Sequence, residues 1–472
     1  MRVTFLAVAA GATLLSSAVP AAANGRFPAS NQIVFSPTDE NLIVLRTSYG
    51  LLPSHDHGAT WGYVCEDALG LGPTALEDPS IGLTTHDALI AGVSVGLDVT
   101  TDVGCNWSCI GGPLAGQALA DIAIRPDNAA RAVALTRTNL PSDAEEPVFL
   151  SQVYETTDEG ATWSAIGVPI DSSVSVATID VAKTDPNRIY VSGTRGFGTA
   201  KTASLFVSTD KGATWTEDTL PPDQFDPSTE DSIYIGAVDP TDADRVYIRS
   251  NGVLTGGKSR LTVFVREADA SPQFTTAKIF DVGAQMGLTG ELLGFALSED
   301  GSKIYVGSQE SGLWVGSAAD LTFHQTNASL IVQCLATHGS ELWACSAAVS
   351  GFVAGVSTND GATFTAKLPL IGSLTGPIAC PANPQGAACG TDANSSQCVA
   401  AYQTFCTTEI CDADGGKTAP ATTPMKASSS CNVGVVGGGG ATAFGVLTAL
   451  AGFSLRRRRR ARSTRRRGRQ EQ

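Results

Sequence analysis

An eight-residue phrase that combines a hydroxyl, a carboxylate, a glycine and a tryptophan recurs along the chain. It reads Ser/Thr-x-Asp-x-Gly-x-Thr-Trp and is intact at residues 54–61, 156–163 and 208–215. Recurring carboxylates can act in acid–base chemistry or as calcium ligands. Short Asp, Ser and Thr side chains also hydrogen-bond the backbone of tight turns, where Gly adopts a positive φ. Because every repeat carries the phrase, we expect a structural role for its acidic position. The residues there are Asp56, Asp102, Asp158, Asp210 and Asn359.

The phrase marks a repeat of about 50 residues. Variants occupy residues 100–107 and 357–364, and decayed copies occupy 267–274 and 317–323. An apolar segment, a Pro/Asp turn and a second apolar segment precede each copy, as at residues 33–45. Each unit therefore holds about four short strands, which is the content of a propeller blade. Seven units predict an all-β, seven-bladed β-propeller. The first and last units each supply four strands, so we expect side-chain packing or a disulfide to close the ring.

This phrase is similar to the Asp-box, or BNR repeat, of sialidases, sortilin-type receptors and xyloglucanases. The resemblance implies that the phrase lies on the hairpin between two strands of a blade. It also implies that Trp61, Trp163 and Trp215 pack between neighbouring blades.

An acidic loop follows the fourth copy of the phrase. Its weak candidates for a Ca²⁺ site are Asp223, Asp226, Glu230 and Asp231. Oxygen ligands suit Ca²⁺, but the loop lacks the ligand spacing of an EF-hand, so a solvated loop is the favoured interpretation. We expect no cofactor, with Ca²⁺ as the weak alternative.

The resemblance to sialidases directs a search for a catalytic site. A sialidase binds the substrate carboxylate with three arginines, and Arg is available at positions 46, 125, 188, 245 and 249. Arg188 and Arg245 recur at the same place in the repeat, which favours a scaffold role. A glycoside hydrolase of the xyloglucanase type needs paired carboxylates, and the sequence selects no pair. The catalytic residues therefore remain unassigned.

The two ends of the chain resemble targeting signals. Residues 1–23 combine Arg2, an apolar stretch and a cleavage motif ending at Ala23, which predicts a secretory signal peptide. At the other end, Cys431 precedes an uncharged segment, 433–455, and then ten arginines. Such a segment is long enough for a membrane-spanning apolar helix, and the arginines would remain on the cytoplasmic side. This order resembles the MYXO-CTERM sorting signal of myxobacterial surface proteins, which implies cleavage near Cys431 by a sorting protease.

Charge separates these ends from the middle of the chain. The 472 residues carry a net charge of −15. Without Arg2, the ten tail arginines and Glu471, 20 basic and 45 acidic residues remain, a net charge of −25. An acidic middle argues against nucleic-acid binding.

If the protein is exported to an oxidising compartment, most of its cysteines should form disulfides. Cys334 and Cys345 flank a strand–turn–strand segment and are disulfide candidates. Three others lie at 65–109 and five at 380–411. Complete pairing of these two odd groups requires at least one bond between them, which would attach a C-terminal module to the first or second blade.

The predicted plan has five parts: a signal peptide (1–23), the propeller (24–372), a small disulfide-rich module (373–412), a Pro/Thr/Ser stalk (413–430) and a sorting tail (431–472). We expect an exported, cell-surface or extracellular monomer that acts as a non-enzymatic binding platform for a glycan or protein. Its other partners would be the export and sorting machinery, with the membrane contacted through the tail. The alternative is a sialidase-like or xyloglucanase-like glycoside hydrolase acting on extracellular polysaccharide.

Overall fold

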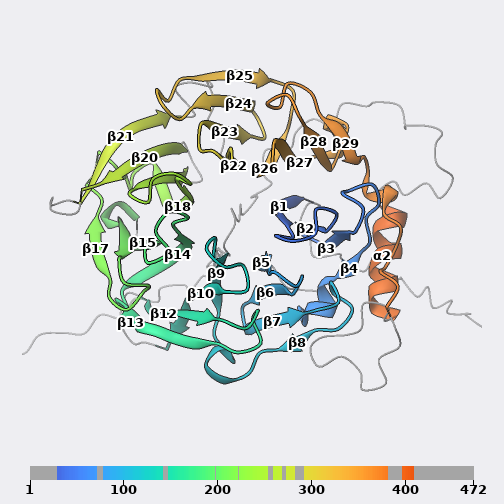
Figure 1. Cartoon of the computed structure of the whole chain (residues 1–472), viewed down its shortest axis with the longest axis horizontal. Helices are drawn as coiled ribbons and strands as arrows, with labels where there is room; N and C mark the ends of the chain where they lie inside the picture. The colour runs from blue at the N-terminus through green and yellow to red at the C-terminus, as the bar shows by residue number, and fades with distance from the viewer. Residues whose placement is uncertain are drawn as a thin grey trace, which may run out of the picture. The chain divides into compact units, whose positions relative to one another are not determined.

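A computed structural model describes residues 29–71, 78–141, 147–196, 198–221, 223–252, 259–267, 273–281, 292–380 and 396–408. In these residues, seven antiparallel sheets stand around a central axis, as Figure 1 shows. The predicted seven-bladed propeller is confirmed. The predicted signal peptide, stalk, Cys431 and apolar helix at 433–455 lie outside the described residues. None of the described helices is long and apolar enough to span a membrane.

The blades follow one another along the chain, and each runs from an inner to an outer strand. Blade 1 is β1 (Ser30–Phe35), β2 (Ile43–Thr47), β3 (Gly50–Ser54) and β4 (Val64–Cys65). Blade 2 is β5 (Ser80–Leu83), β6 (Leu89–Val93), β7 (Gly96–Thr100) and β8 (Ser108–Cys109). Blade 3 is β9 (Leu119–Ile124), β10 (Ala132–Thr136), β12 (Val148–Thr156) and β13 (Ser164–Ile170), with the short β11 (Thr138–Leu140) added beside β12.

The remaining four blades have the simple four-strand order. Blade 4 is β14 (Val174–Val181), β15 (Ile189–Arg195), β16 (Thr202–Ser208) and β17 (Thr216–Thr219). Blade 5 is β18 (Glu230–Val238), β19 (Arg245–Gly252), β20 (Arg260–Arg266) and β21 (Phe274–Asp281). Blade 6 is β22 (Gly294–Leu297), β23 (Lys303–Ser308), β24 (Gly312–Ser317) and β25 (Phe323–Asn327). Blade 7 is β26 (Val332–His338), β27 (Glu341–Ser346), β28 (Ala354–Ser357) and β29 (Thr365–Leu368).

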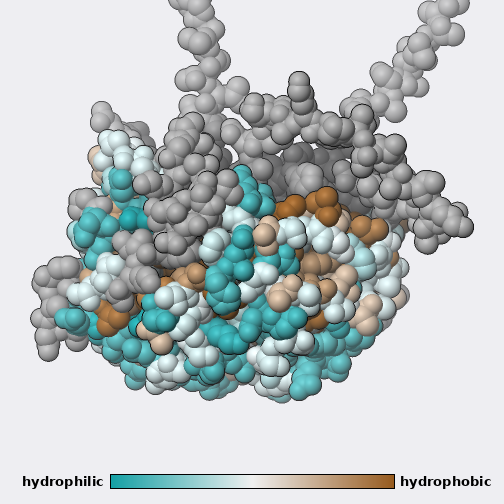
Figure 2. Space-filling model, turned by 90° about the horizontal axis from the view of Figure 1, so that it is seen from above, coloured by the Kyte–Doolittle hydropathy of each residue, from teal (hydrophilic) through white to brown (hydrophobic). Residues whose placement is uncertain are grey.

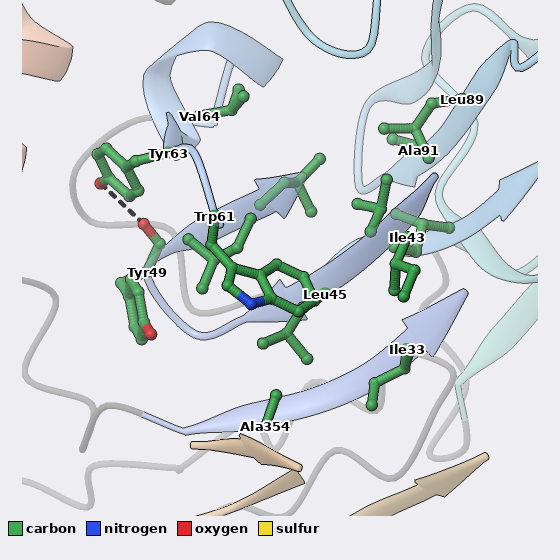
Figure 3. Close-up of a cluster of buried hydrophobic side chains, with 14 of the residues drawn as sticks. Ile33, Ile43, Leu45, Tyr49, Trp61, Tyr63, Val64, Leu89, Ala91 and Ala354 are labelled. Carbon is green, nitrogen blue, oxygen red and sulfur yellow. Dashed lines mark hydrogen bonds between the residues drawn. The ribbon is translucent and has the colours of Figure 1, made fainter. Parts of the chain in front are cut away.

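The core lies between blades, where both faces of each second and third strand are covered. In β2 and β10, every residue is buried, which explains why their sequences are apolar runs and not alternating patterns. Between blades 7 and 1, Trp61 packs with Ile33, Leu45 and Ala354 in one apolar cluster (Figure 3). Each blade therefore depends on its neighbours for burial of its apolar faces.

The ring closes without exchange of a strand, as the four-strand first and last units predict. Blade 1 contains β1–β4 and blade 7 contains β26–β29. After β29, the chain returns to the outer edge of blade 1, where Tyr63 and Pro377 form a parallel bridge. The N–H of Tyr63 donates to the carbonyl of Gly376 (2.9 Å), and the N–H of Ile378 donates to the carbonyl of Tyr63 (3.1 Å).

Disulfides reinforce this closure. Cys65 is bonded to Cys398 and Cys105 to Cys380, so the predicted bond between the two cysteine groups is confirmed twice. The helix α2 (Ser396–Thr408), which the sequence analysis did not predict, carries Cys398 and lies outside β4 in Figure 1. Cys334 and Cys345 are bonded across the hairpin of β26 and β27. We call residues 374–380 together with α2 the clasp.

Candidate functional site

The recurring phrase forms the same turn between the third and fourth strands of five blades. We call residues 54–61, 100–107, 156–163, 208–215 and 357–364 the repeated turns. In blade 3, the Asp158 carboxylate accepts hydrogen bonds from the hydroxyl of Thr156 (2.8 Å) and from the N–H and hydroxyl of Thr162 (2.8 and 2.6 Å). The hydroxyl oxygen of Thr156 accepts the N–H of Gly160 (2.9 Å). One carboxylate thus organises the entire turn.

The same bonds recur in the turns of blades 1, 2 and 4. Hydrogen bonds from Thr162 and Thr214 hold the pKa of Asp158 and of Asp210 below the usual range. In blade 7, Asn359 takes the place of Asp, and its amide donates to the hydroxyl of Thr363 (2.9 Å). Since an amide is compatible with the turn, the turn does not require a charge. These side chains are engaged within their own turns and are poorly placed to transfer protons to a ligand.

The fourth position of three repeated turns contacts the neighbouring blade through a polar side chain, a feature that sequence reasoning missed. This residue has a left-handed backbone in all five turns, with φ between 53° and 62°. Glu159 accepts from the hydroxyl of Thr84 (3.2 Å), and Asp360 accepts from Lys303 (2.8 Å). His57 lies 3.1 Å from the Glu341 carboxylate. The available signal was the polar character of this position in four of the five copies.

Three of the four Ca²⁺ candidates bind protein groups through their side chains. The Glu230 carboxylate is buried and forms an ion pair with Arg260, and Asp231 forms one with Lys201. Asp226 accepts hydrogen bonds from the N–H and hydroxyl of Ser228, which lower its pKa, while Asp223 is exposed. Within the described ranges, no three His, Cys, Asp or Glu side chains are placed together to hold a metal ion.

The candidate arginines are spread over separate parts of the ring. Arg46 donates to the carbonyl of Pro79 (2.9 Å), and Arg125 donates to the carbonyl of Pro186. Arg188 pairs with Asp244. Arg245 donates to the carbonyl of Ala318 (3.1 Å), and Arg249 donates to that of Leu293 (2.9 Å). Each of these contacts reaches from one blade to the next, so the five side chains do not form one carboxylate-binding site.

Two aspartates on the innermost strands of their blades have a raised pKa. Asp121 on β9 accepts the N–H of Ile179 (3.0 Å), and Asp180 on β14 accepts the N–H of Val238 (3.0 Å). Burial raises the pKa of Asp121 to about 7 and that of Asp180 to about 6, and the charge of Asp180 adds to the effect on Asp121. Each links its blade to the next. Both lie in apolar strand sequences, so the pattern alone gave no reason to select them.

The face opposite the repeated turns carries exposed apolar side chains. Second-to-third-strand connections lie at this face, because neighbouring strands of a blade are antiparallel. Val95, Leu140 and Val349 follow the second strands of blades 2, 3 and 7 and are 67%, 40% and 83% exposed. Val168 on β13 is 62% exposed. Figure 2 views the molecule from the side and shows mostly hydrophilic and neutral residues with several apolar spots. Exposed apolar side chains contribute to a contact surface where they gather into a patch rimmed by polar residues.

Comparisons with known proteins agree with a propeller. The family model Sortilin-Vps10, described as sortilin, neurotensin receptor 3, matches residues 97–230, from β7 to the start of β18. No curated protein matches the chain.

Solved structures similar to the chain have low identity. YCF48 from Cyanidioschyzon merolae is 15% identical, over 67% of this chain and 92% of that one, with a TM-score of 0.47. The β-propeller domain of Cps50 (Swd1) from Myceliophteria thermophila is 9% identical, over 68% and 94%, with a TM-score of 0.44. The GH74 xyloglucanase of Xanthomonas campestris is 15% identical, over 75% and 66%, with a TM-score of 0.35. Matches at these levels carry no information about substrate or activity.

Proposed function

We propose that the protein is an exported, surface-sorted propeller that binds an extracellular glycan or protein without catalysis. The observation that carries this proposal is a contrast between polar and apolar side chains: the polar candidates are engaged by the scaffold, while several apolar side chains are exposed. The candidate arginines and three of the four Ca²⁺ candidates bind other parts of the scaffold, whereas Val95 and Val349 are exposed at the face opposite the repeated turns. Apolar side chains on surface loops of a rigid scaffold are suited to partner contact.

Export and surface sorting are part of the same proposal. The described disulfides support an oxidising compartment, because such bonds are rare in the cytosol. We propose that residues 1–23 are a signal peptide and that the tail from Cys431 is a MYXO-CTERM-type signal. The hydrogen bonds of the repeated turns support their assignment as Asp-boxes, with Asp56, Asp102, Asp158 and Asp210 in structural roles.

Binding assays with face-selective variants test the platform. We expect the segment 24–430 to bind at least one member of a panel of extracellular glycans and envelope proteins. Val95→Asp and Val349→Asp should weaken that binding about tenfold or more, because each places a charge where an apolar contact forms. The control is Lys211→Ala, on a repeated turn and exposed. If all three variants bound as tightly as the wild type, the contact surface would lie elsewhere and the proposal would be contradicted.

A glycoside hydrolase is the second candidate, favoured by Asp121 and Asp180. Neighbouring carboxyl groups with different pKa values are a typical acid–base arrangement. Their hydrogen bonds to backbone N–H groups of adjacent blades favour a structural role instead. Sugar release from a glycan panel decides between them. Product formation that Asp121→Asn abolishes, with the variant's folding shown by circular dichroism, would establish the hydrolase and end the platform proposal.

A further inference from the structure

The two disulfides of the clasp differ in how exposed their cysteine residues are. Cys65 and Cys398 are 2% and 0% exposed, so their bond lies inside the blade 1 core. Cys105 is 8% exposed, but its partner Cys380 is only half-buried at the edge of that core. Thiol–disulfide exchange begins with attack of a thiolate on one accessible sulfur. Of the two bonds, Cys105–Cys380 is therefore the one open to attack in the folded protein.

The position of Cys380 links this bond to the closure of the ring. Cys380 lies two residues after Ile378, whose N–H donates to the carbonyl of Tyr63. Three residues earlier than Ile378, the N–H of Thr375 donates to the carbonyl of Trp61 (2.9 Å). These backbone bonds hold residues 375–378 on the outer edge of blade 1. The disulfide fixes the far end of this segment to blade 2.

The other end of the bond is rigid. Cys105 belongs to the repeated turn 100–107, where Asp102 accepts the N–H and the side-chain amide of Asn106 (2.8 and 2.6 Å). A broken bond therefore leaves the turn in place and frees the clasp side. The segment 375–378 would then depend on its backbone bonds and on the bond from the Thr375 hydroxyl to the carbonyl of Trp61 (2.9 Å). Its remaining covalent restraints would be the Cys65–Cys398 bridge, about 20 residues further along the chain, and the disulfide of Cys109.

We propose that Cys105–Cys380 is a thiol–disulfide exchange site that releases residues 375–380 from blade 1, with a small dithiol as co-reactant. One thiolate of the dithiol attacks Sγ of Cys380, the S–S bond breaks, and Cys105 leaves as a thiolate that takes a proton from water. The second thiol of the reagent, as a thiolate, then attacks the mixed disulfide. It yields the cyclic disulfide of the reagent and a thiolate on Cys380, which is protonated by solvent. Two electrons pass from the dithiol to the protein.

Graded reduction of the full chain tests the site. Native protein is treated with increasing dithiothreitol, new thiols are alkylated, and each cysteine is quantified by mass spectrometry. We expect Cys105 and Cys380 to be alkylated about tenfold or more faster than the buried pairs Cys65–Cys398 and Cys334–Cys345. Cys109, which is also disulfide-bonded, is followed in the same digest. Simultaneous reduction of the three bridges, or earlier reduction of either buried pair, would overturn the proposal.

Hydrogen exchange tests the release of the clasp. In protein reduced only at Cys105–Cys380, the amides of Tyr63, Thr375 and Ile378 should exchange about tenfold or more faster, while the β26–β27 hairpin should be unchanged. The variant Cys105→Ser/Cys380→Ser should reproduce this change without reductant, and Cys334→Ser/Cys345→Ser is the matched control. Unchanged exchange at these three amides after selective reduction refutes release. If the double variant does not fold, hydrogen exchange in the selectively reduced wild-type protein still tests the release of residues 375–380.

Discussion

At the scale of single residues, the surroundings of each carboxylate decide what it does. Asp158 and Asp210 accept hydrogen bonds within their turns that hold their pKa below the usual range. Asp121 and Asp180 accept N–H groups of the next blade, but burial outweighs these bonds and raises their pKa. Asp98 on β7 is 6% exposed, and burial raises its pKa to about 7. Carboxylates that look alike in the sequence thus fall into three chemical classes.

The repeated turn makes a prediction about Asp158. Asp158→Ala leaves the N–H and hydroxyl of Thr162 without their acceptor, so it should lower the free energy of unfolding by about 1–3 kcal/mol. Asp158→Asn should cost clearly less, because Asn359 already occupies this place in blade 7 and accepts the N–H of Thr363 (3.0 Å). Urea denaturation of the two variants measures the difference. Equal losses would mean that the negative charge, and not the acceptor oxygen, stabilises the turn.

Asp98 makes a prediction about pH. Its pKa is higher in the folded protein (about 7) than in the unfolded chain (near 3.8). Its contribution to stability is therefore full below about pH 4 and is lost as pH rises through 7. Asp98→Asn removes the ionisation, so the variant should gain at least about 1 kcal/mol relative to wild type between pH 5 and pH 8. Urea unfolding at both values measures this. A pH-independent difference between the two proteins would show that Asp98 does not titrate in this range.

At the scale of elements, the repeat predicted the blades well because turns and apolar strands are local features. Asp, Gly and Trp at fixed spacing identify the connection between third and fourth strands in all intact copies. The contacts that join blades were harder to predict. The contact of Asp121 with the N–H of Ile179 depends on strand register, and the cysteine pairing depends on how the chain returns to blade 1. The helix α2 was missed because its residues, such as Ser396, Cys398 and Thr408, form no apolar stripe.

Close approach of neighbouring blades makes a prediction about Gly307 on β23. A Cβ atom there would lie 2.6–2.8 Å from the side chain of Val332 on β26. Gly307→Ala should therefore destabilise the protein by about 1–3 kcal/mol, as overpacking of a core does. Gly111→Ala is the matched control, because its added Cβ meets nothing within 4 Å and should change stability by no more than about 0.5 kcal/mol. Thermal and urea unfolding of both variants give the comparison. A neutral Gly307→Ala would show that blades 6 and 7 can separate at low cost.

At the scale of the whole molecule, the seam between blades 7 and 1 is where the first and last blades meet, and the chain crosses it after β29 on its return to the outer edge of blade 1. Side chains still span it, since Ser30 donates from its N–H to Gln333 (3.2 Å) and Trp61 donates to the carbonyl of Lys367 (3.2 Å). The clasp adds backbone hydrogen bonds on the outer edge and two covalent bonds. Its disulfides span 333 and 275 residues, so they constrain nearly the entire propeller. The clasp, which follows the last blade, therefore adds backbone and covalent bonds to the side-chain contacts that close the ring.

The two clasp disulfides should act as a coupled pair. While Cys105–Cys380 is intact, the Cys65–Cys398 bond closes an effective loop of only about 60 residues. Without it, and with Cys109→Ser as the background of every variant so that the disulfide of Cys109 is also removed, the same bond closes a loop of 333. Loop entropy grows with the logarithm of length, so loss of one bond should cost about 1.5 kcal/mol more when the other is already absent. A double-mutant cycle of Cys65→Ser/Cys398→Ser and Cys105→Ser/Cys380→Ser, measured by urea unfolding, tests this. Strictly additive losses would mean that each bridge stabilises only its local contacts. The ring would then be closed by side-chain packing alone.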